Sequence, residues 1–199
     1  MALYLSKTVV ELREVSLRNK PQSMLEISPK GTVPVLLLDD GSVIDESIEI
    51  IEWCIKKKKD MFKDTLKKEQ ELFAEDAIKL FDEKFKFHLD RYKYATRYED
   101  VDEILHRDSC VEILKTMEKK ISNNKFFYTN HVNKIDICIL PFIRQFRIAN
   151  PEWFDNHNEF PKVQKLLNNF LHSSILEEIM VTHEEWKKDN SAIFFPTNL

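Results

Sequence analysis

Glycine is scarce in this chain of 199 residues, where only Gly31 and Gly41 occur. Rossmann fingerprints and phosphate-cradling loops need several glycines close together, so the sequence excludes the common nucleotide-binding α/β enzymes. Long apolar runs are also lacking. The longest, residues 33–38 and 138–143, fall far short of the ~20 residues that span a bilayer. We therefore expect no membrane segment and no membrane partner.

Cysteine and histidine are few and dispersed. The three cysteines, Cys54, Cys110 and Cys138, are odd in number and widely spaced, and no secretory apolar core precedes them. We therefore expect a reducing, cytoplasmic compartment. The six histidines never fall at a metal-ligand spacing along the sequence, so we expect no metal. The formal charge of −4 argues against binding to a phosphate backbone, and we expect no nucleic-acid partner.

The pattern of apolar residues changes near residue 60. Residues 1–60 mix short apolar runs with turn signals, as alternating strands and helices do, whereas residues 66–190 are almost wholly helical in pattern. We expect these two segments to form separate domains. In the first domain the pattern predicts strands at 9–15, 33–38 and 42–44 and helices at 21–27 and 45–59.

The second segment contains one helix that is apolar on nearly every side, residues 135–148. Such a helix is typical of the buried centre of a bundle. Pro141 lies inside it and is expected to kink it, because proline cannot donate the backbone hydrogen bond of its turn. The other expected helices are amphipathic and would surround it.

Residues 28–36, with the sequence SPKGTVPVL, contain a proline directly before an apolar strand. Pro34 cannot donate a ladder hydrogen bond, so it marks a sheet edge or a cis turn. A cis Val33–Pro34 bond would turn the backbone groups of Val33 outward, ready to pair with an extended peptide ligand. An ordinary trans turn entering the strand would leave no such site, and spacing alone does not separate the two interpretations.

A second motif, Asp45-Glu46-Ser47, stands directly before a strongly amphipathic helix. A hydroxyl and free backbone N–H groups at a helix start form an anion site without any further group. The alternative is plain capping, in which Asp45 or Ser47 closes the helix and binds nothing.

Taken together, these motifs resemble the glutathione S-transferase family. Residues 28–54 resemble the stretch from that family's second helix through its cis-proline and hairpin into the third helix. Asn133 and Asp136 resemble the capping box of the buried sixth helix, and residues 135–171 resemble bacterial members. The resemblance extends over residues 1–186 and implies a thioredoxin-like α/β domain followed by an all-helical domain.

The resemblance also implies roles for matching positions. Val33 would offer its backbone to the cysteinyl part of glutathione beside cis-Pro34, and Glu46 and Ser47 would bind the γ-glutamyl end. Glutathione would be the co-substrate, without a metal, and a small electrophile or mixed disulfide would receive it. The family further implies a homodimer, formed through the third helix and the start of the second domain.

The chain departs from the family at its beginning. Members start with a strand and a loop bearing a Cys, Ser or Tyr that steadies the glutathione thiolate, whereas residues 1–5 already resemble the later part of the first helix. The absent strand is an interior one, and its loss would leave unpaired backbone groups on both neighbouring strands. Either Met1 lies within a longer protein or the chain is a shortened relative.

Without that loop, no residue of the chain is assigned a catalytic role, and we expect weak chemistry from these 199 residues alone. Two functions therefore stay open. One is a glutathione transferase. The other is a non-catalytic binding module, similar to the stringent starvation protein A family, that uses the same fold to hold a protein partner.

Overall fold

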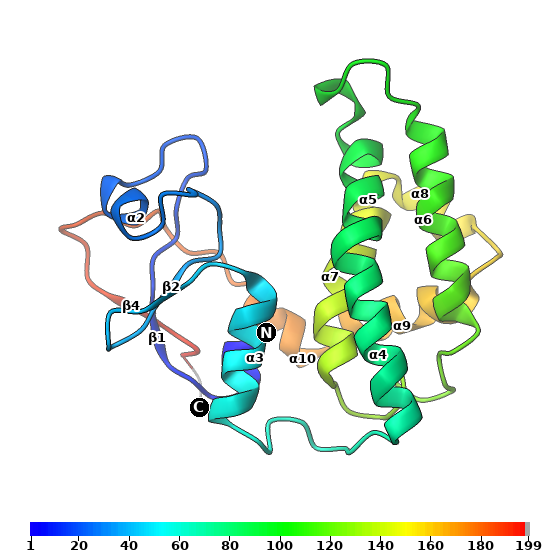
Figure 1. Ribbon diagram of the computed structural model, residues 1–199, viewed down its shortest axis with the longest axis horizontal. Helices are drawn as coiled ribbons and strands as arrows, with labels where there is room; N and C mark the ends of the chain where they lie inside the picture. Colours follow the sequence, from blue (N-terminus) through cyan, green and yellow to red (C-terminus); the bar gives the residue numbers. More distant parts are fainter. Residues whose placement is uncertain (198–199) are drawn as a thin grey trace. The chain divides into compact units, whose positions relative to one another are not determined.

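The structure is a computed structural model that describes residues 1–197. The chain divides into two units, shown in Figure 1. The first comprises residues 1–61 and the described residues from Ser174 onward, and the second comprises residues 62–173. Residues 174–190 therefore do not cluster with the helical domain to which the sequence analysis assigned them. They return to the first unit because their backbone bonds there: the N–H of Trp186 donates to the carbonyl of Glu14 at 2.8 Å.

The first unit is built from short elements. Its helices are α1 (Ala2–Leu5), α2 (Gln22–Ile27), α3 (Ser47–Lys57) and α10 (Ser174–Ile179), and its strands are β1 (Val10–Leu12), β2 (Leu36–Leu37), β3 (Val43–Ile44) and β4 (Ile193–Phe195). The predicted elements before residue 60 are all present. The strands are shorter than the apolar runs that predicted them.

Strands β2 and β3 form the predicted antiparallel hairpin, in which Leu36 pairs with Ile44 and Leu37 with Val43. Gly41 takes a positive φ of 83° in the turn, a conformation that glycine adopts without steric cost. The Asp40 carboxylate accepts hydrogen bonds from both the N–H and the hydroxyl of Ser42. These side-chain bonds close the turn and set the register of the hairpin.

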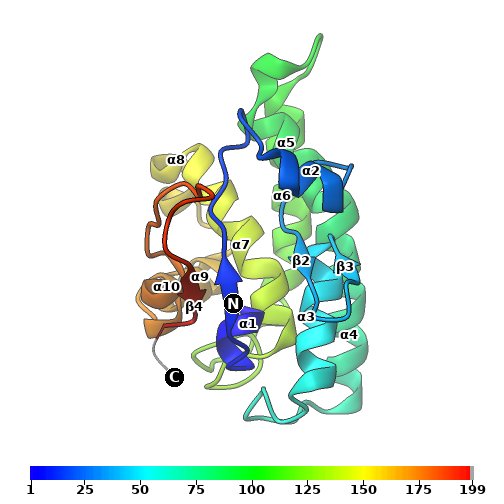
Figure 2. The ribbon, with the colours of Figure 1, turned by 90° about the vertical axis from the view of Figure 1, so that its left-hand side faces the viewer.

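Strand β1 pairs with a strand that the sequence analysis missed. Residues Val10–Leu12 form an antiparallel ladder with β4, and Figure 2 shows the two side by side. Among the described residues β1 and β2 share no pairing, so the unit contains two separate two-stranded sheets. The apolar, β-prone triplet Ile193–Phe195 before Pro196 was the available signal for β4.

Helix α3 is amphipathic and buries Ile50 and Cys54. Helix α1 packs against it. Glu49 lies in the first turn of α3, and Lys56 and Lys57 lie in its last turn, an arrangement that stabilises the helix dipole. This helix places its N-terminus, with Ser47, beside the loop that precedes β2.

The second unit is helical throughout its regular structure. Its elements are α4 (Lys68–Leu80), the π-helical turn η1 (Phe81–Phe85), α5 (Lys86–Lys93), the 3₁₀ turn η2 (Ala95–Arg97), α6 (Glu103–Glu118), α7 (Lys134–Ala149), α8 (Pro151–Asn156) and α9 (Pro161–Leu171). Helices α4 and α5 run through η1 as one continuous rod, and α6 returns antiparallel beside α5 (Figure 1).

Helix α7 is the buried centre of this unit, as its sequence predicts. Its buried residues include Ile135, Ile139, Ile143 and Phe146, each no more than 1% exposed. The helix continues on both sides of Pro141. The kink expected at Pro141 stays a prediction. Aromatic side chains from η1, α5 and α8 converge on Phe146, which tightens the core around α7.

The predicted capping box at the start of α7 is present. The side chain of Asn133 accepts a hydrogen bond from the N–H of Ile135 at 3.2 Å, and Asp136 accepts one from the N–H of Asn133 at 3.0 Å. Asp136 also accepts a hydrogen bond from the N–H of Phe127 at 2.9 Å, so it ties the preceding loop to the helix. Among residues 1–197, no helix has both the length and the apolar composition to cross a bilayer.

Candidate functional site

The loop before β2 is tied to the start of α3 by two side-chain contacts. The hydroxyl of Ser28 donates a hydrogen bond to the Asp45 carboxylate at 3.0 Å, and Lys30 forms an ion pair with Glu46. Gly31 has a φ of +64°, and a Cβ there would approach the Leu25 side chain at 3.3 Å. The loop therefore needs glycine at this position, and its two ties bring the motif of residues 28–36 to the motif of residues 45–47.

The Val33–Pro34 peptide bond is cis, as the first of the two interpretations predicts. Val33 is 48% exposed, and its backbone N–H and C=O have no hydrogen-bond partner among the described residues. The strand ladder begins only at Leu36. A free donor and a free acceptor on one exposed residue are what an extended peptide needs in order to pair with a main chain.

The N-terminus of α3 has no side-chain cap. Its N-cap residue, Glu46, is engaged with Lys30, and Asp45 accepts from Ser28 instead of from the helix. The first intrahelical bond runs from the N–H of Ile50 to the carbonyl of Glu46 at 3.1 Å. The three N–H groups before it, starting at Ser47, are therefore free of capping, and plain capping does not account for this motif.

The charges around this helix start have both signs. The pKa of Lys30 is raised, first by its hydrogen bond to Glu46 and then by the charges of Asp45 and Glu49. The exposed hydroxyl of Ser47 lies next to free N–H groups that carry partial positive charge. The arrangement suits a zwitterion, because the N–H groups attract a carboxylate while Glu46 attracts an ammonium group.

The hydroxyl and thiol groups near the chain start are engaged in packing. Ser6 is 6% exposed, and its hydroxyl donates to the Leu3 carbonyl at 3.2 Å and to the Thr8 hydroxyl at 2.9 Å. Burial raises the pKa of the Cys54 thiol, although a hydrogen bond from Ser6 opposes the shift. Neither group is an exposed nucleophile or an activated thiol.

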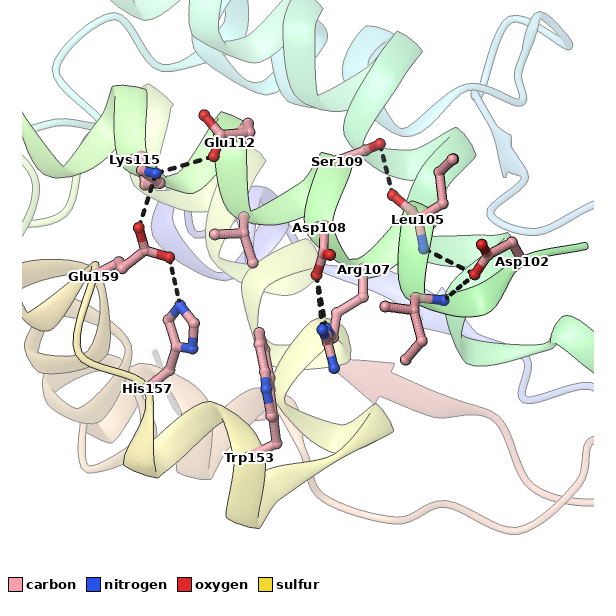
Figure 3. A pocket seen from close by; sticks show the side chains of 12 residues that line it. Asp102, Leu105, Arg107, Asp108, Ser109, Glu112, Lys115, Trp153, His157 and Glu159 are labelled. Carbon is pink, nitrogen blue, oxygen red and sulfur yellow. Dashed lines mark hydrogen bonds and ion pairs between the residues drawn. The ribbon is translucent and has the colours of Figure 1, made fainter.

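The helical unit contains an open pocket of about 740 Å³ along α6, α8 and the loop that follows α8 (Figure 3). Lys115 bridges Glu112 at 3.0 Å and Glu159 at 2.8 Å, and Glu159 also bonds His157. Arg107 pairs with Asp108 and covers the ring of Trp153, as the close-up shows. These charged or titratable side chains are partnered with one another, and Asp102, which also lines the pocket, caps α6. No motif in the sequence pointed to a residue of this pocket.

No three His, Cys, Asp or Glu side chains converge as a metal site within the described part of the chain. The three cysteines are buried, and none of them forms a disulfide within the described residues. Burial raises the pKa of the Cys110 thiol to about 12, which keeps that thiol protonated.

Known proteins with similar sequences are glutathione S-transferases. Residues 1–57 match the family model described as the glutathione S-transferase N-terminal domain, and these residues carry the loop of Val33 and the start of α3. The chain is also 27% identical over 150 residues to a probable glutathione S-transferase, parA, of Nicotiana tabacum. The chain is therefore similar to the glutathione S-transferase family, through residues 1–57 and through relatives of this kind.

The match to the tobacco protein covers 73% of this chain and 66% of the tobacco protein. The chain therefore spans about two thirds of that relative's length. Solved structures agree on the fold. A ternary complex of BphK, a bacterial GST, has a TM-score of 0.69 at 16% identity, and 88% of each chain is covered. A sphingomonad glutathione S-transferase complexed with glutathione gives a TM-score of 0.69 at 15% identity with the same coverage.

These likenesses confirm the predicted fold class: a thioredoxin-like unit followed by the helical domain of the family. The proposed roles of Val33, Pro34, Glu46 and Ser47 stay predictions. The structure shows that the loop and the helix start are tied together and that their backbone groups are free.

Proposed function

We propose that the chain binds glutathione at the exposed loop before β2 and the start of α3. The N–H and C=O of Val33 pair with the main chain of the cysteinyl residue. The γ-glutamyl carboxylate binds Ser47 and the free N–H groups of α3, and its ammonium group faces Glu46. The free backbone groups of Val33, tied to an uncapped helix start, are the observation that carries this proposal.

The proposed activity is transfer of glutathione to a small electrophile, or reduction of a mixed disulfide. Glutathione is then a co-substrate that the chain holds in place. Its thiolate forms a C–S bond with an electrophilic carbon and expels a leaving group such as halide, or it attacks one sulfur of a mixed disulfide and releases the other sulfur as a thiolate. Support comes from the match of residues 1–57 to the family's N-terminal domain and from the similar sphingomonad protein that was solved with glutathione. We further propose that the protein acts in the cytoplasm, where its three buried thiols stay reduced, and as a homodimer.

A second function is favoured by one specific observation. The hydroxyl of Ser6 is buried and already bonded to Leu3 and Thr8, so it is not free to steady a thiolate. A chain that holds glutathione without activating it would serve as a binding module, and its partner would be another protein.

Calorimetric titration of the full chain with reduced glutathione tests the binding site. We expect one site per chain, and Ser47→Ala should weaken binding by roughly 10-fold because a hydrogen bond to a charged group contributes about 1.5 kcal/mol. Glu46→Gln should weaken it similarly, through the lost charge opposite the ammonium group. Ser109→Ala is the control, because Ser109 is a half-buried helical serine of the other unit whose hydroxyl donates to the Leu105 carbonyl.

A measurement of catalytic turnover distinguishes the transferase from the binding module. Conjugation of glutathione to an activated aryl halide, measured on the same preparation, should exceed the uncatalysed rate if the chain is a transferase. Binding of glutathione with no turnover, together with a defined protein complex, would support the module. If glutathione does not bind and Ser47→Ala changes nothing, the proposed site is wrong. Light scattering of the same sample measures whether the chain is a dimer.

A further inference from the structure

Two histidines meet between neighbouring helices of the second unit. His88 lies on α5 and His106 lies on α6, and their Nδ1 atoms are 2.8 Å apart. The ring of Phe87 contacts both imidazoles edge-on, with centroid distances of 5.2 Å to His88 and 5.8 Å to His106. Eighteen residues separate the two histidines along the chain, which is why no motif in the sequence pointed to them.

The distance between the two nitrogens is close to that of a chelate. Imidazole binds Zn²⁺ with bonds of ~2.0–2.1 Å, which places two ligand nitrogens ~2.9 Å apart at a right angle and ~3.3 Å apart at a tetrahedral angle. The two Nδ1 atoms are 2.8 Å apart, so they must separate by only a few tenths of an ångström to reach these values. Rotation of the two histidine side chains can supply this change. The bound ion would replace the proton that is shared in the hydrogen bond between the two nitrogens.

The surroundings of His88 favour the neutral imidazole that a metal requires. The pKa of His88 is lowered, first by burial and then by the charges of His106, Arg91 and Lys84. A neutral imidazole keeps a lone pair for coordination. The same two cations, Arg91 and Lys84, reduce the affinity for any positive ion, so binding should be weak and exchangeable.

We propose that His88 and His106 together chelate one divalent transition-metal ion through their Nδ1 atoms. Within residues 1–197 no third His, Cys, Asp or Glu converges on the pair, so water fills the remaining coordination positions. Two nitrogen ligands select Cu²⁺ over Ni²⁺ and Zn²⁺, and they do not retain Mg²⁺ or Ca²⁺, which prefer oxygen. The ion would link α5 to α6 and stabilise the helical unit.

The test is a titration of the tag-free full chain, previously treated with chelator, with Cu²⁺, Ni²⁺, Zn²⁺ and Mg²⁺ at pH 7.5. We expect one site for Cu²⁺, weaker binding of Ni²⁺ and Zn²⁺, no binding of Mg²⁺, and a higher melting temperature with the bound ion. His88→Gln and His106→Gln should each weaken binding by at least about 10-fold, because each removes one of only two protein ligands. The control is His172→Gln, since His172 is an exposed histidine whose Nδ1 lies 2.9 Å from the Asn168 carbonyl oxygen.

Electron paramagnetic resonance of the Cu²⁺-loaded wild-type chain supplies a readout that does not depend on how the variants fold. Two equivalent imidazole nitrogens should couple to the copper, and lowering the pH to 5 should release the ion. The proposal fails if the spectrum shows one imidazole, if His172→Gln weakens binding as much as His88→Gln, or if both Gln variants fold and bind like the wild type.

Discussion

The two units of the molecule are stabilised differently. Among the described residues, six buried apolar side chains lie in the first unit and 28 in the second. Every fully buried phenylalanine lies in the second unit, whereas short ladders, turns and side-chain ties hold the first together. The helical unit is stabilised mainly by its packed apolar core. The first unit keeps backbone groups exposed at Val33 and at the start of α3.

This difference fits the binding role that we propose for the first unit. A residue that pairs its main chain with a ligand must leave that main chain unpaired and near solvent, so it adds little to a core. Ties such as Ser28 with Asp45 then hold the loop in place instead of packing. We therefore expect the first unit to be the less stable one and to gain stability when a ligand binds. Five experiments test this comparison.

The largest effect should come from the core of the helical unit. Phe146 is 1% exposed and contacts the rings of Phe85, Tyr92, Trp153 and Phe154. Phe146→Ala should lower the free energy of unfolding by about 3–5 kcal/mol, because the lost contacts leave a cavity. Thermal denaturation measures the loss. Ile148→Ala, on the same helix but 42% exposed, should cost far less, and equal melting of the two variants would contradict this account.

The next effect should come from Asp136, which is fully buried and accepts bonds from the N–H groups of Phe127 and Asn133. Asp136→Ala leaves two buried donors unpaired and should cost about 2–3 kcal/mol in urea denaturation. Asp136→Asn keeps one acceptor oxygen and should cost less. If the Asn and Ala variants are equally unstable, the hydrogen bonds are not the cause.

Asp136 also predicts a dependence on pH. Burial raises its pKa to about 7, well above the ordinary value of 3.8. Between these values the folded chain holds a proton that the unfolded chain has lost, so this group makes the free energy of unfolding fall as the pH rises from about 4 to about 7. Asp136→Asn cannot ionise and should remove this part of the slope.

A smaller effect, confined to the first unit, should follow loss of β4. A chain that stops after Ala192 lacks the partner of Val10–Leu12. We expect a loss of about 1–2 kcal/mol in the first unit, from the missing ladder bonds and cross-strand contacts. Hydrogen exchange at the amides of β1 should accelerate while exchange in α7 stays slow. Phe194→Ala is the control, since that side chain is 54% exposed, and it should leave β1 protected.

The smallest effect should appear in mild acid at the helical unit. The lowered pKa of His88 means that the unfolded chain takes up its proton first as the pH drops below the ordinary value of 6.5. The free energy of unfolding should therefore decrease as the pH falls through this range, and His88→Gln should reduce that decrease. A steeper decrease in the variant would show that the pair is not the responsible group.

Local patterns in the sequence predicted most elements and the main motifs. The amphipathic periods of α3 and α9, the apolar helix α7 and its Asn133–Asp136 cap are all determined by residues close together in the chain. The cis interpretation of Val33–Pro34 was one of two that spacing left open. The loop and helix motifs of the candidate site lie within about 20 residues, so their proximity is a nearly local property.

Only the tertiary structure decided what depends on distant partners. Strand β4 pairs with β1 across some 180 residues, and the ladder of β1 is only as long as that partner allows. The tie from Trp186 to Glu14 returns the end of the chain to the first unit, and the packing of α5 on α6 brings His88 to His106. A sequence states which groups can bond, but the choice among distant partners depends on which pairing buries apolar surface without leaving backbone groups unpaired.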